Sequence, residues 1–288
     1  MKNIQAPIGI FDSGIGGLTV LKEIYRELPS EDLVYFGDTA RVPYGTKSKD
    51  TISRYSCDNI RFLKNFDIKL VIVACNTASS LAMEAMKSHT SLPIIGVIEP
   101  GARSALAKTK NGRVGVIGTR ATIGSGSYEA CLKSQDPKIR VYSQACPMFV
   151  PLAEEGWTDG EIALKVAKTY LEPLKNFGID TLILGCTHYP LLAQAIQKTM
   201  GDGVTLVNSA EETAREAKAL LLQQQLTTDR DRAADMRFYV SDEPEQFRVL
   251  GERFLGQTIH SVTKVSFVEE APQGDVIGAS SVEKPVRR

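Results

Sequence analysis

The sequence has no excess of charge of either sign. Lys and Arg together number 34 and Asp and Glu together number 34, so the formal net charge at pH 7 is zero. A chain without an overall field is poorly suited to attract a polyanion or an anionic membrane surface. We therefore expect no nucleic acid and no membrane among its partners, and a small molecule as its ligand.

The sequence also lacks an apolar run long enough to cross a bilayer, and Met1 to Asp12 contains no apolar segment of signal-peptide length. These absences predict a cytoplasmic protein. The 288 residues are 43% hydrophobic and 24% charged, which is the balance of a packed protein rather than a disordered one. Two domains of ordinary size are expected from this length.

The cysteines are odd in number and have no CxxC spacing, which argues against a disulfide framework and against a zinc ribbon. We expect no metal site. Each thiol therefore needs its own interpretation, and the five are Cys57, Cys75, Cys131, Cys146 and Cys186.

Short β-rich runs alternate with amphipathic helical patterns along most of the chain. This rhythm predicts the α/β class, with parallel sheets flanked by helices. The expected strands are Ile8–Phe11, Leu33–Phe36, Leu70–Val73, Ile94–Ile98, Val114–Ile117, Ile139–Tyr142, Thr181–Leu184, Val204–Val207 and Arg237–Val240. The clearest helical stretches are Leu18–Leu28, Lys49–Phe66, Ala78–Lys87, Asp159–Phe177, Ser209–Leu222 and Glu243–Leu255.

An internal duplication is suggested by two pairs of similar segments. IGIFDSGIGG at Ile8 resembles VGVIGTRATIGSG at Val114, an offset of 114 less 8, or 106 residues. LVIVACNTASS resembles TLILGCTHYPLL, and their cysteines, Cys75 and Cys186, are offset by 186 less 75, or 111 residues. Because the order and nearly the spacing are kept, we expect two like domains rather than chance similarity between buried strands.

The domain division is expected to follow this duplication. Residues 1–99 with 209–270 would form the first α/β domain, which contains Cys75, and residues 100–208 the second, which contains Cys186. The first boundary is placed near Pro100 and Gly101. The Gly-, Ser- and Lys-containing residues 271–288 are expected to form a disordered tail.

Cys75 and Cys186 each follow a predicted strand and precede a helical pattern. Ligands of open α/β sheets bind beyond the carboxyl ends of the strands, where helix N-termini offer free N–H groups. The same helix dipole is expected to lower the pKa of a thiol. Cys57 and Cys131 lie within helical patterns and are interpreted as structural, and the role of Cys146 stays open.

Polar residues follow both thiols and a third strand end. Asn and Thr at such positions can simply cap a helix, yet here they also offer donors beside each thiol. The turn at Gly14, Gly16 and Gly17 fails the GxGxxG pattern, because Thr19 stands where the last Gly is required, and it lacks the Lys of a P-loop. The candidate contacts are Asp12, Ser13, Asn76, Thr77, Thr187 and His188.

Five motifs in order are similar to those of the glutamate racemases, within the aspartate/glutamate racemase superfamily. They are FDSGIGGLTV, GDTARVPYG, ACNTAS, FVPLAEEG and LGCTHYPLL, and the resemblance covers Ile8 to about Phe267. It implies two pseudo-symmetric α/β domains with the active site in the cleft between them, no pyridoxal phosphate or other cofactor, no metal, and D-glutamate made for peptidoglycan. A homodimer is an open possibility.

The resemblance also assigns residues. Cys75 would take the Cα proton from D-glutamate and Cys186 from L-glutamate. Asp38 and Glu154 are possible auxiliary groups. The substrate contacts that it implies are Asp12, Ser13, Tyr44, Gly45, Asn76, Thr77, Thr187 and His188.

Three other functions remain open from the residues alone. An aspartate racemase would share the two cysteines but have a shorter pocket, and the PYG motif favours glutamate. A thiol redox or peroxide-sensing protein would also need reactive cysteines, although it usually has a resolving cysteine within reach. A ligand-binding module without catalysis could be built from the same two lobes.

Overall fold

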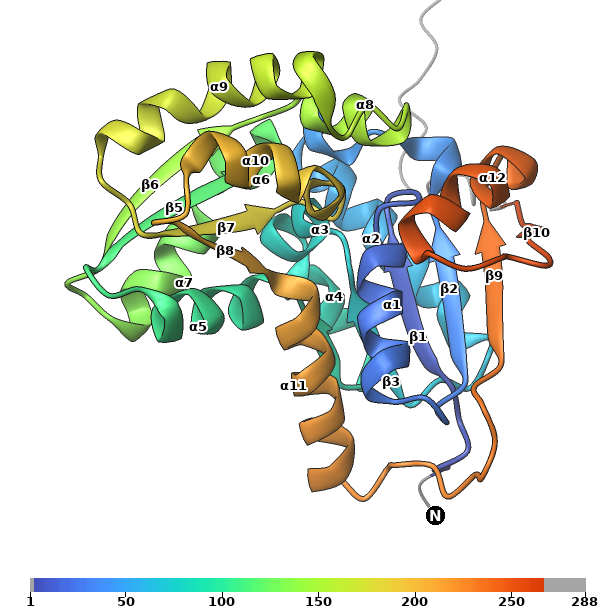
Figure 1. Cartoon of the computed structure of the whole chain (residues 1–288). Helices are drawn as coiled ribbons and strands as arrows, with labels where there is room; N and C mark the ends of the chain where they lie inside the picture. Colours follow the sequence, from blue (N-terminus) through green and yellow to red (C-terminus); the bar gives the residue numbers. More distant parts are fainter. Residues whose placement is uncertain (1–2, 267–288) are drawn as a thin grey trace, which may run out of the picture.

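Two parallel β-sheets organise the chain in a computed structural model that describes residues 3–266 (Figure 1). The first sheet has the strand order β10-β9-β2-β1-β3-β4, and the second has the order β6-β5-β7-β8. All of the strand pairs among the described residues are parallel. The expected α/β class with two helix-flanked parallel sheets is therefore confirmed. The predicted tail at 271–288 lies outside the described residues.

The first sheet is built from the beginning and the end of the described chain, and the second from its middle. The strands of the first are β1 (Ile8–Asp12), β2 (Leu33–Gly37), β3 (Leu70–Val73), β4 (Ile94–Gly96), β9 (Met236–Val240) and β10 (Thr263–Lys264). Those of the second are β5 (Arg113–Gly118), β6 (Arg140–Ala145), β7 (Thr181–Gly185) and β8 (Thr205–Asn208).

The helices cover both faces of the two sheets. Those that follow strands of the first sheet are α1 (Leu18–Glu27), α2 (Lys49–Lys64), α3 (Asn76–Leu81), α4 (Met83–His89), α5 (Ile98–Lys108) and α12 (Pro244–Leu255). Those that follow strands of the second are α6 (Arg120–Gly124), α7 (Ser127–Gln135), α8 (Phe149–Glu154), α9 (Gly160–Asn176), α10 (Ala193–Met200) and α11 (Ser209–Gln223). The described residues also contain short 3₁₀ helices, which are η1 (Thr39–Arg41), η2 (Tyr44–Thr46) and η3 (Tyr189–Leu192).

The strand orders contain the same four-strand unit twice. The order β2-β1-β3-β4 in the first sheet corresponds to β6-β5-β7-β8 in the second, with each strand at the same place in the order and in the chain. This correspondence agrees with the duplication in the sequence, and it places the loops after β3 and β7, which contain the two thiols, at equivalent positions.

Packing joins the two halves. The apolar face of α1 buries Leu18, Leu21 and Ile24, and each such side chain stabilises the fold by about 1.5–3 kcal/mol relative to its exposed state. These residues belong to one continuous core cluster that also contains Ile117 and Cys186 from the second half. The cleft between the halves is therefore supported by a shared core.

The prediction of a strand at Ile94–Ile98 is correct at its start but wrong at its end. β4 ends at Gly96, and α5 begins at Ile98, so that Pro100 and Gly101 lie inside this helix. Proline is tolerated in a first helical turn, where its missing N–H would have no helical partner. Gly101 packs so closely that a Cβ would come 3.0 Å from Ser209. The helix predicted at Ala78–Lys87 is also divided, into α3 and α4.

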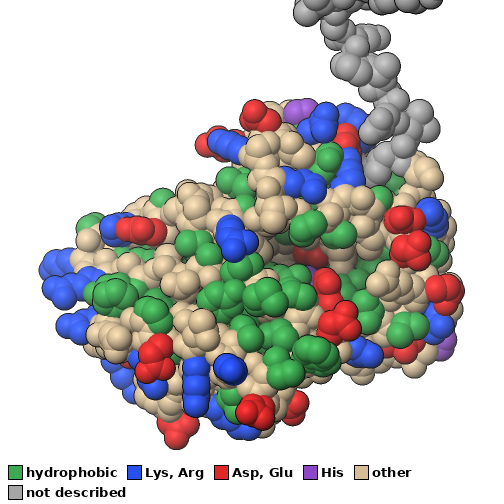
Figure 2. All heavy atoms as spheres, turned by 90° about the horizontal axis from the view of Figure 1, so that it is seen from above, with side chains coloured by type: hydrophobic (Ala, Val, Ile, Leu, Met, Phe, Trp, Pro, Cys, Tyr) green, Lys and Arg blue, Asp and Glu red, His purple; other side chains and the backbone are tan. Residues whose placement is uncertain are grey.

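The face that contains α8, α9 and α12 is hollowed near its centre, and hydrophobic side chains gather around the hollow (Figure 2). The exposed large apolar side chains of these elements and their flanks are Met148, Trp157, Ile162, Phe177 and Val249.

Candidate active site

The loops after β3 and β7 place both predicted thiols at one cavity of about 360 Å³. Cys75 is the residue directly before α3. Cys186 follows β7 and is succeeded by η3 and then α10, so the expected α-helical start is a 3₁₀ turn at this position. Both side chains are buried, with 5% and 7% exposure. A small ligand in this cavity would contact a thiol from each half of the molecule.

Most of the predicted contacts line the same cavity, and two do not. The lining includes Ser13, Tyr44, Gly45, Asn76, Thr77, Glu154, Thr187 and His188. Asp12 and Asp38 are fully buried behind it. These two carboxylates can therefore act on a ligand through their neighbours rather than by direct contact in this arrangement.

The environment of Cys75 disfavours the thiolate. Its Sγ donates to Ser13 Oγ at 3.7 Å. Burial, with a smaller contribution from the charge of Asp12, raises the pKa of this thiol to about 12. The expectation that the helix dipole would lower the pKa of Cys75 is therefore wrong, because the loss of water around the buried sulfur outweighs the dipole.

Cys186 is paired with an imidazole. Its Sγ lies 3.8 Å from Nδ1 of His188, and Nε2 of His188 lies 3.0 Å from Glu154 Oε1. Burial alone would lower the pKa of His188, but the hydrogen bonds with Cys186 and Glu154 together raise it to about 10. The chain Glu154–His188–Cys186 can hold a proton next to the thiol.

Asp38 organises the loop that contains Tyr44. It accepts hydrogen bonds from Arg41 Nε, from Ser241 Oγ at 3.1 Å and from the hydroxyl of Tyr44. Asn59 Nδ2 donates to the same hydroxyl at 3.1 Å. Because the hydroxyl of Tyr44 is engaged on the side away from the cavity, what Tyr44 offers a ligand is its ring and backbone.

Asp12 has one oxygen satisfied and one without a hydrogen-bond partner. Oδ2 accepts from the backbone N–H of Gly14 at 2.9 Å, while Oδ1 is buried and unpaired among the described residues. Burial raises the pKa of Asp12. The contact of Asp12 with a substrate stays a prediction.

The end of β5 also contributes to the site, which the sequence motifs did not indicate. Thr119 and Arg120 line the cavity, and Thr119 Oγ1 lies 3.1 Å from Thr77 Oγ1 across the cleft. The duplication could have indicated them, since aligning Ile8 with Val114 matches Ser13 with Thr119. A second link across the cleft, in which the Tyr128 hydroxyl donates to Asn76 Oδ1 at 2.7 Å, had no sequence signal.

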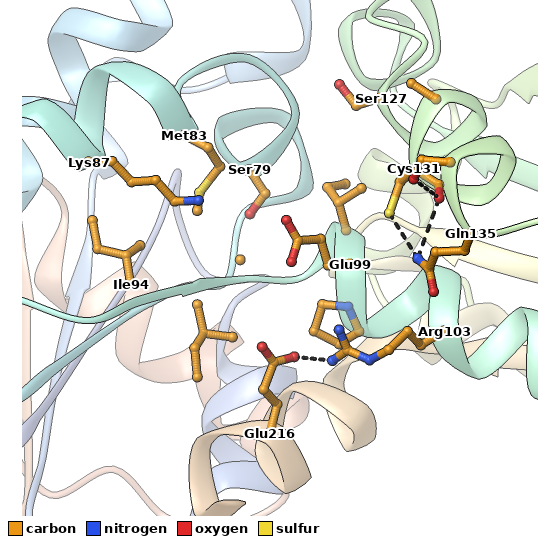
Figure 3. A pocket seen from close by; sticks show the side chains of 16 residues that line it. Ser79, Met83, Lys87, Ile94, Glu99, Arg103, Ser127, Cys131, Gln135 and Glu216 are labelled. Carbon is orange, nitrogen blue, oxygen red and sulfur yellow. Dashed lines mark hydrogen bonds and ion pairs between the residues drawn. The ribbon is translucent and has the colours of Figure 1, made fainter. Parts of the chain in front are cut away.

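A larger cavity, of about 590 Å³, lies elsewhere, where α4, α5, α7 and α11 meet (Figure 3). The Glu99 carboxylate points into it, and at its edge Arg103 forms an ion pair with Glu216. Cys131 is the thiol on its wall. Because Cys75 and Cys186 are absent from its lining, we place the chemistry in the smaller cavity.

The described residues contain neither a metal-binding cluster nor a membrane-spanning helix. Among residues 3–266, no group of three His, Cys, Asp or Glu side chains is close enough together to hold a metal ion. Within the same residues, no helix is both long enough and apolar enough to span a bilayer.

Comparison with known proteins identifies the class. The family model of the Asp/Glu/hydantoin racemases matches residues 8–217. The glutamate racemase of Geobacter metallireducens is 55% identical over 263 residues, which cover 91% of this chain and 97% of that protein. The chain belongs to the Asp/Glu/hydantoin racemase family. The glutamate racemases in this family are isomerases.

Solved structures place the chain more narrowly. The crystal structure of glutamate racemase isoform RacE1 from Bacillus anthracis matches with a TM-score of 0.88 and 42% identity, over 92% of this chain and 98% of that one. The glutamate racemase of Francisella tularensis, crystallised with D-glutamate, matches with a TM-score of 0.86 and 40% identity, over 91% and 98% of the two chains. Within the family, the chain groups with the glutamate racemases.

Proposed function

We propose that this chain interconverts L- and D-glutamate by two-base proton transfer at Cα, with Cys75 and Cys186 as the bases. The observation that carries the proposal is that the two thiols come from equivalent loops of the two halves and line one cavity. Racemisation removes a proton from one face of Cα and returns one to the other, so two groups must flank the substrate. The D-glutamate formed would supply peptidoglycan synthesis.

Each turnover needs one thiolate and one thiol. The thiolate takes the Cα proton, the opposite thiol gives its own proton to the other face, and the two residues exchange protonation states. We assign the proton of D-glutamate to Cys75 and that of L-glutamate to Cys186, following the family resemblance. His188 and Glu154 would hold a proton beside Cys186, since they form a hydrogen-bonded chain to its sulfur.

The carbanion intermediate must be stabilised without an electron sink from a cofactor. Hydrogen-bond donors that point at the α-carboxylate can stabilise the carbanion, because negative charge develops on that carboxylate. We assign this task to Ser13, Asn76 and Thr187, which line the cavity beside the thiols. The remaining substrate contacts would be made by Thr77, Tyr44, Gly45 and His188. Asp12 and Asp38 would act indirectly, by positioning residues that line the cavity.

Hydrogen–deuterium exchange tests both substrate and mechanism. Wild-type protein in deuterated water, with chelator present and no pyridoxal phosphate, should exchange the Cα proton of both enantiomers of glutamate, followed by proton NMR. Cys75→Ala and Cys186→Ala should both lose racemisation. Cys186→Ala should retain slow exchange of D-glutamate only, and Cys75→Ala that of L-glutamate only.

The control is Cys57→Ala, because Cys57 is a buried thiol in α2 outside the cavity. It should racemise like wild type. Full racemase activity in either active-site variant would refute the two-base mechanism, and the opposite pairing would reverse the facial assignment. Aspartate as substrate should give little exchange. Loss of all activity in chelator would overturn the cofactor-free proposal.

Three further assignments belong to this proposal. The domain division at 1–99 with 209–270 and at 100–208 is supported by the strands, since those of the second sheet all fall between Arg113 and Asn208. We also propose a cytoplasmic location and a homodimer, and analytical ultracentrifugation would decide the oligomeric state.

A further inference from the structure

The imidazole of His188 has five neighbours that fix its orientation. Nδ1 faces Cys186 Sγ at 3.8 Å and Thr187 Oγ1 at 3.4 Å, and Nε2 faces Glu154 Oε1 at 3.0 Å. The backbone of Gly16 lies so close that a Cβ there would come 2.5 Å from Nδ1. The ring of Phe254 meets the imidazole edge to face, with the ring centroids 5.2 Å apart and the planes at 80°.

Phe254 comes from α12, which follows a strand of the first sheet, whereas His188 and Glu154 follow strands of the second. Phe254 is almost fully buried at 2% exposure. The preceding residue, Arg253, donates through Nη1 to the backbone carbonyl of Glu154 at 3.4 Å. Figure 1 shows α12 beside the end of α8. The helix therefore contacts both partners of the His188–Glu154 hydrogen bond.

We propose that Phe254 is a positioning residue for proton transfer at Cys186. By packing against the imidazole, it holds the ring plane in which one nitrogen reaches the sulfur and the other reaches Glu154. Rotation of this ring would lengthen both hydrogen bonds at once. This inference rests on the two-base function proposed above and deepens it.

Removal of the Phe254 ring should affect proton transfer at Cys186 and not at Cys75. His188 contacts Cys186, whereas the hydrogen-bond partner of Cys75 is Ser13. Loss of the Phe254 ring should therefore slow exchange of the enantiomer that Cys186 deprotonates and leave the other enantiomer nearly unchanged. A merely structural role would affect both enantiomers alike, because it would reduce the amount of folded protein.

The test compares Phe254→Leu with Leu255→Ala, a control that removes buried apolar volume from the adjacent residue of the same helix. Cα exchange in deuterated water is measured for both enantiomers. Misplacement of a catalytic group by a fraction of an ångström should lower exchange in Phe254→Leu about tenfold on the Cys186 side and less than about twofold on the other. The fall should be in kcat more than in KM. Phe254→Tyr, which keeps a ring, should retain most of the rate.

A second measurement needs no turnover. Alkylation by iodoacetamide, followed site by site with mass spectrometry, should slow at Cys186 in Phe254→Leu, because the imidazole that lies 3.8 Å from its sulfur would turn away and could no longer take up the thiol proton during the reaction. Alkylation of Cys75 should not change. Equal loss of exchange for both enantiomers, or the same one-sided loss in Leu255→Ala, would overturn the inference. Absence of exchange in wild type would overturn the proposed function instead, and the alkylation comparison would still decide the role of Phe254.

Discussion

Replacement of Tyr128 by Phe should weaken substrate binding, although Tyr128 lies outside the lining of the cavity. Its hydroxyl, from α7 in one half, donates to Asn76 Oδ1 in α3 of the other half at 2.7 Å. An amide has one acceptor side and one donor side. While Tyr128 occupies the oxygen, the Nδ2 group of Asn76 remains to donate to a carboxylate in the cavity that Asn76 lines.

The size of the effect follows from these contacts. Without the hydroxyl, the amide can turn, and its oxygen would then face the substrate carboxylate. A hydrogen bond to a charged group contributes about 1.5–3 kcal/mol, and about 1.4 kcal/mol corresponds to a tenfold change. KM for glutamate should therefore rise between about tenfold and about a hundredfold. The buried acceptor that loses its donor should also lower the free energy of unfolding by about 1–3 kcal/mol.

Steady-state kinetics and urea denaturation test this reasoning together. Tyr142→Phe is the control, because that ring stacks on Phe177 away from the cavity. In an Asn76→Ala background, Tyr128→Phe should cause no further rise in KM, since the two residues would act through one hydrogen bond. An unchanged KM in Tyr128→Phe, or additive effects in the double variant, would refute the proposed orientation of the amide.

Three other substitutions have defined outcomes. Gly16→Ala should reduce kcat/KM more than about a hundredfold in a folded protein, because a Cβ there would meet Thr187 Oγ1 at 2.2 Å; near-normal kinetics would contradict the packing. Lys69→Met should cost about 3–5 kcal/mol in urea denaturation without changing KM, because it leaves the buried Glu31 without its ion-pair partner. The pKa of His188 is raised from 6.5 to about 10 in the fold, so its protonation stabilises the protein fully below pH 6.5 and less as the pH rises through 10. Denaturation of His188→Gln should lack this decrease, and a pH dependence equal to that of wild type would disprove it.

The positions of the two thiols could be predicted from the sequence because they depend on local pattern. A buried parallel strand is a short apolar run, and its carboxyl end is the place where the next polar residues meet a ligand. Cys75 and Cys186 both follow such runs, and the duplicated order of strands makes their places equivalent. These features survive in a single sequence because they are repeated in it.

Contacts made by distant elements could not be predicted in this way. Pro100 and Gly101 look like a break in the sequence, yet both lie in α5, because proline is tolerated in a first helical turn and Gly101 allows close approach to Ser209. Phe254 looks like any apolar residue of an amphipathic helix, and only the fold brings it to His188. Such juxtapositions depend on how the two halves pack together, which residue spacing does not record.

The protonation of Cys75 could not be predicted either, and its energetics explain why. The sequence indicates a helix start, whose dipole favours an anion by at most about 2 kcal/mol. Burial, with a smaller contribution from the charge of Asp12, raises the pKa of this thiol from 9.0 to about 12, so the loss of water outweighs the dipole. The spacing of residues shows that Cys75 precedes a helix, but it does not show how completely the fold removes water from the sulfur. The direction of this pKa shift is therefore a property of the tertiary packing, in which Cys75 is 5% exposed.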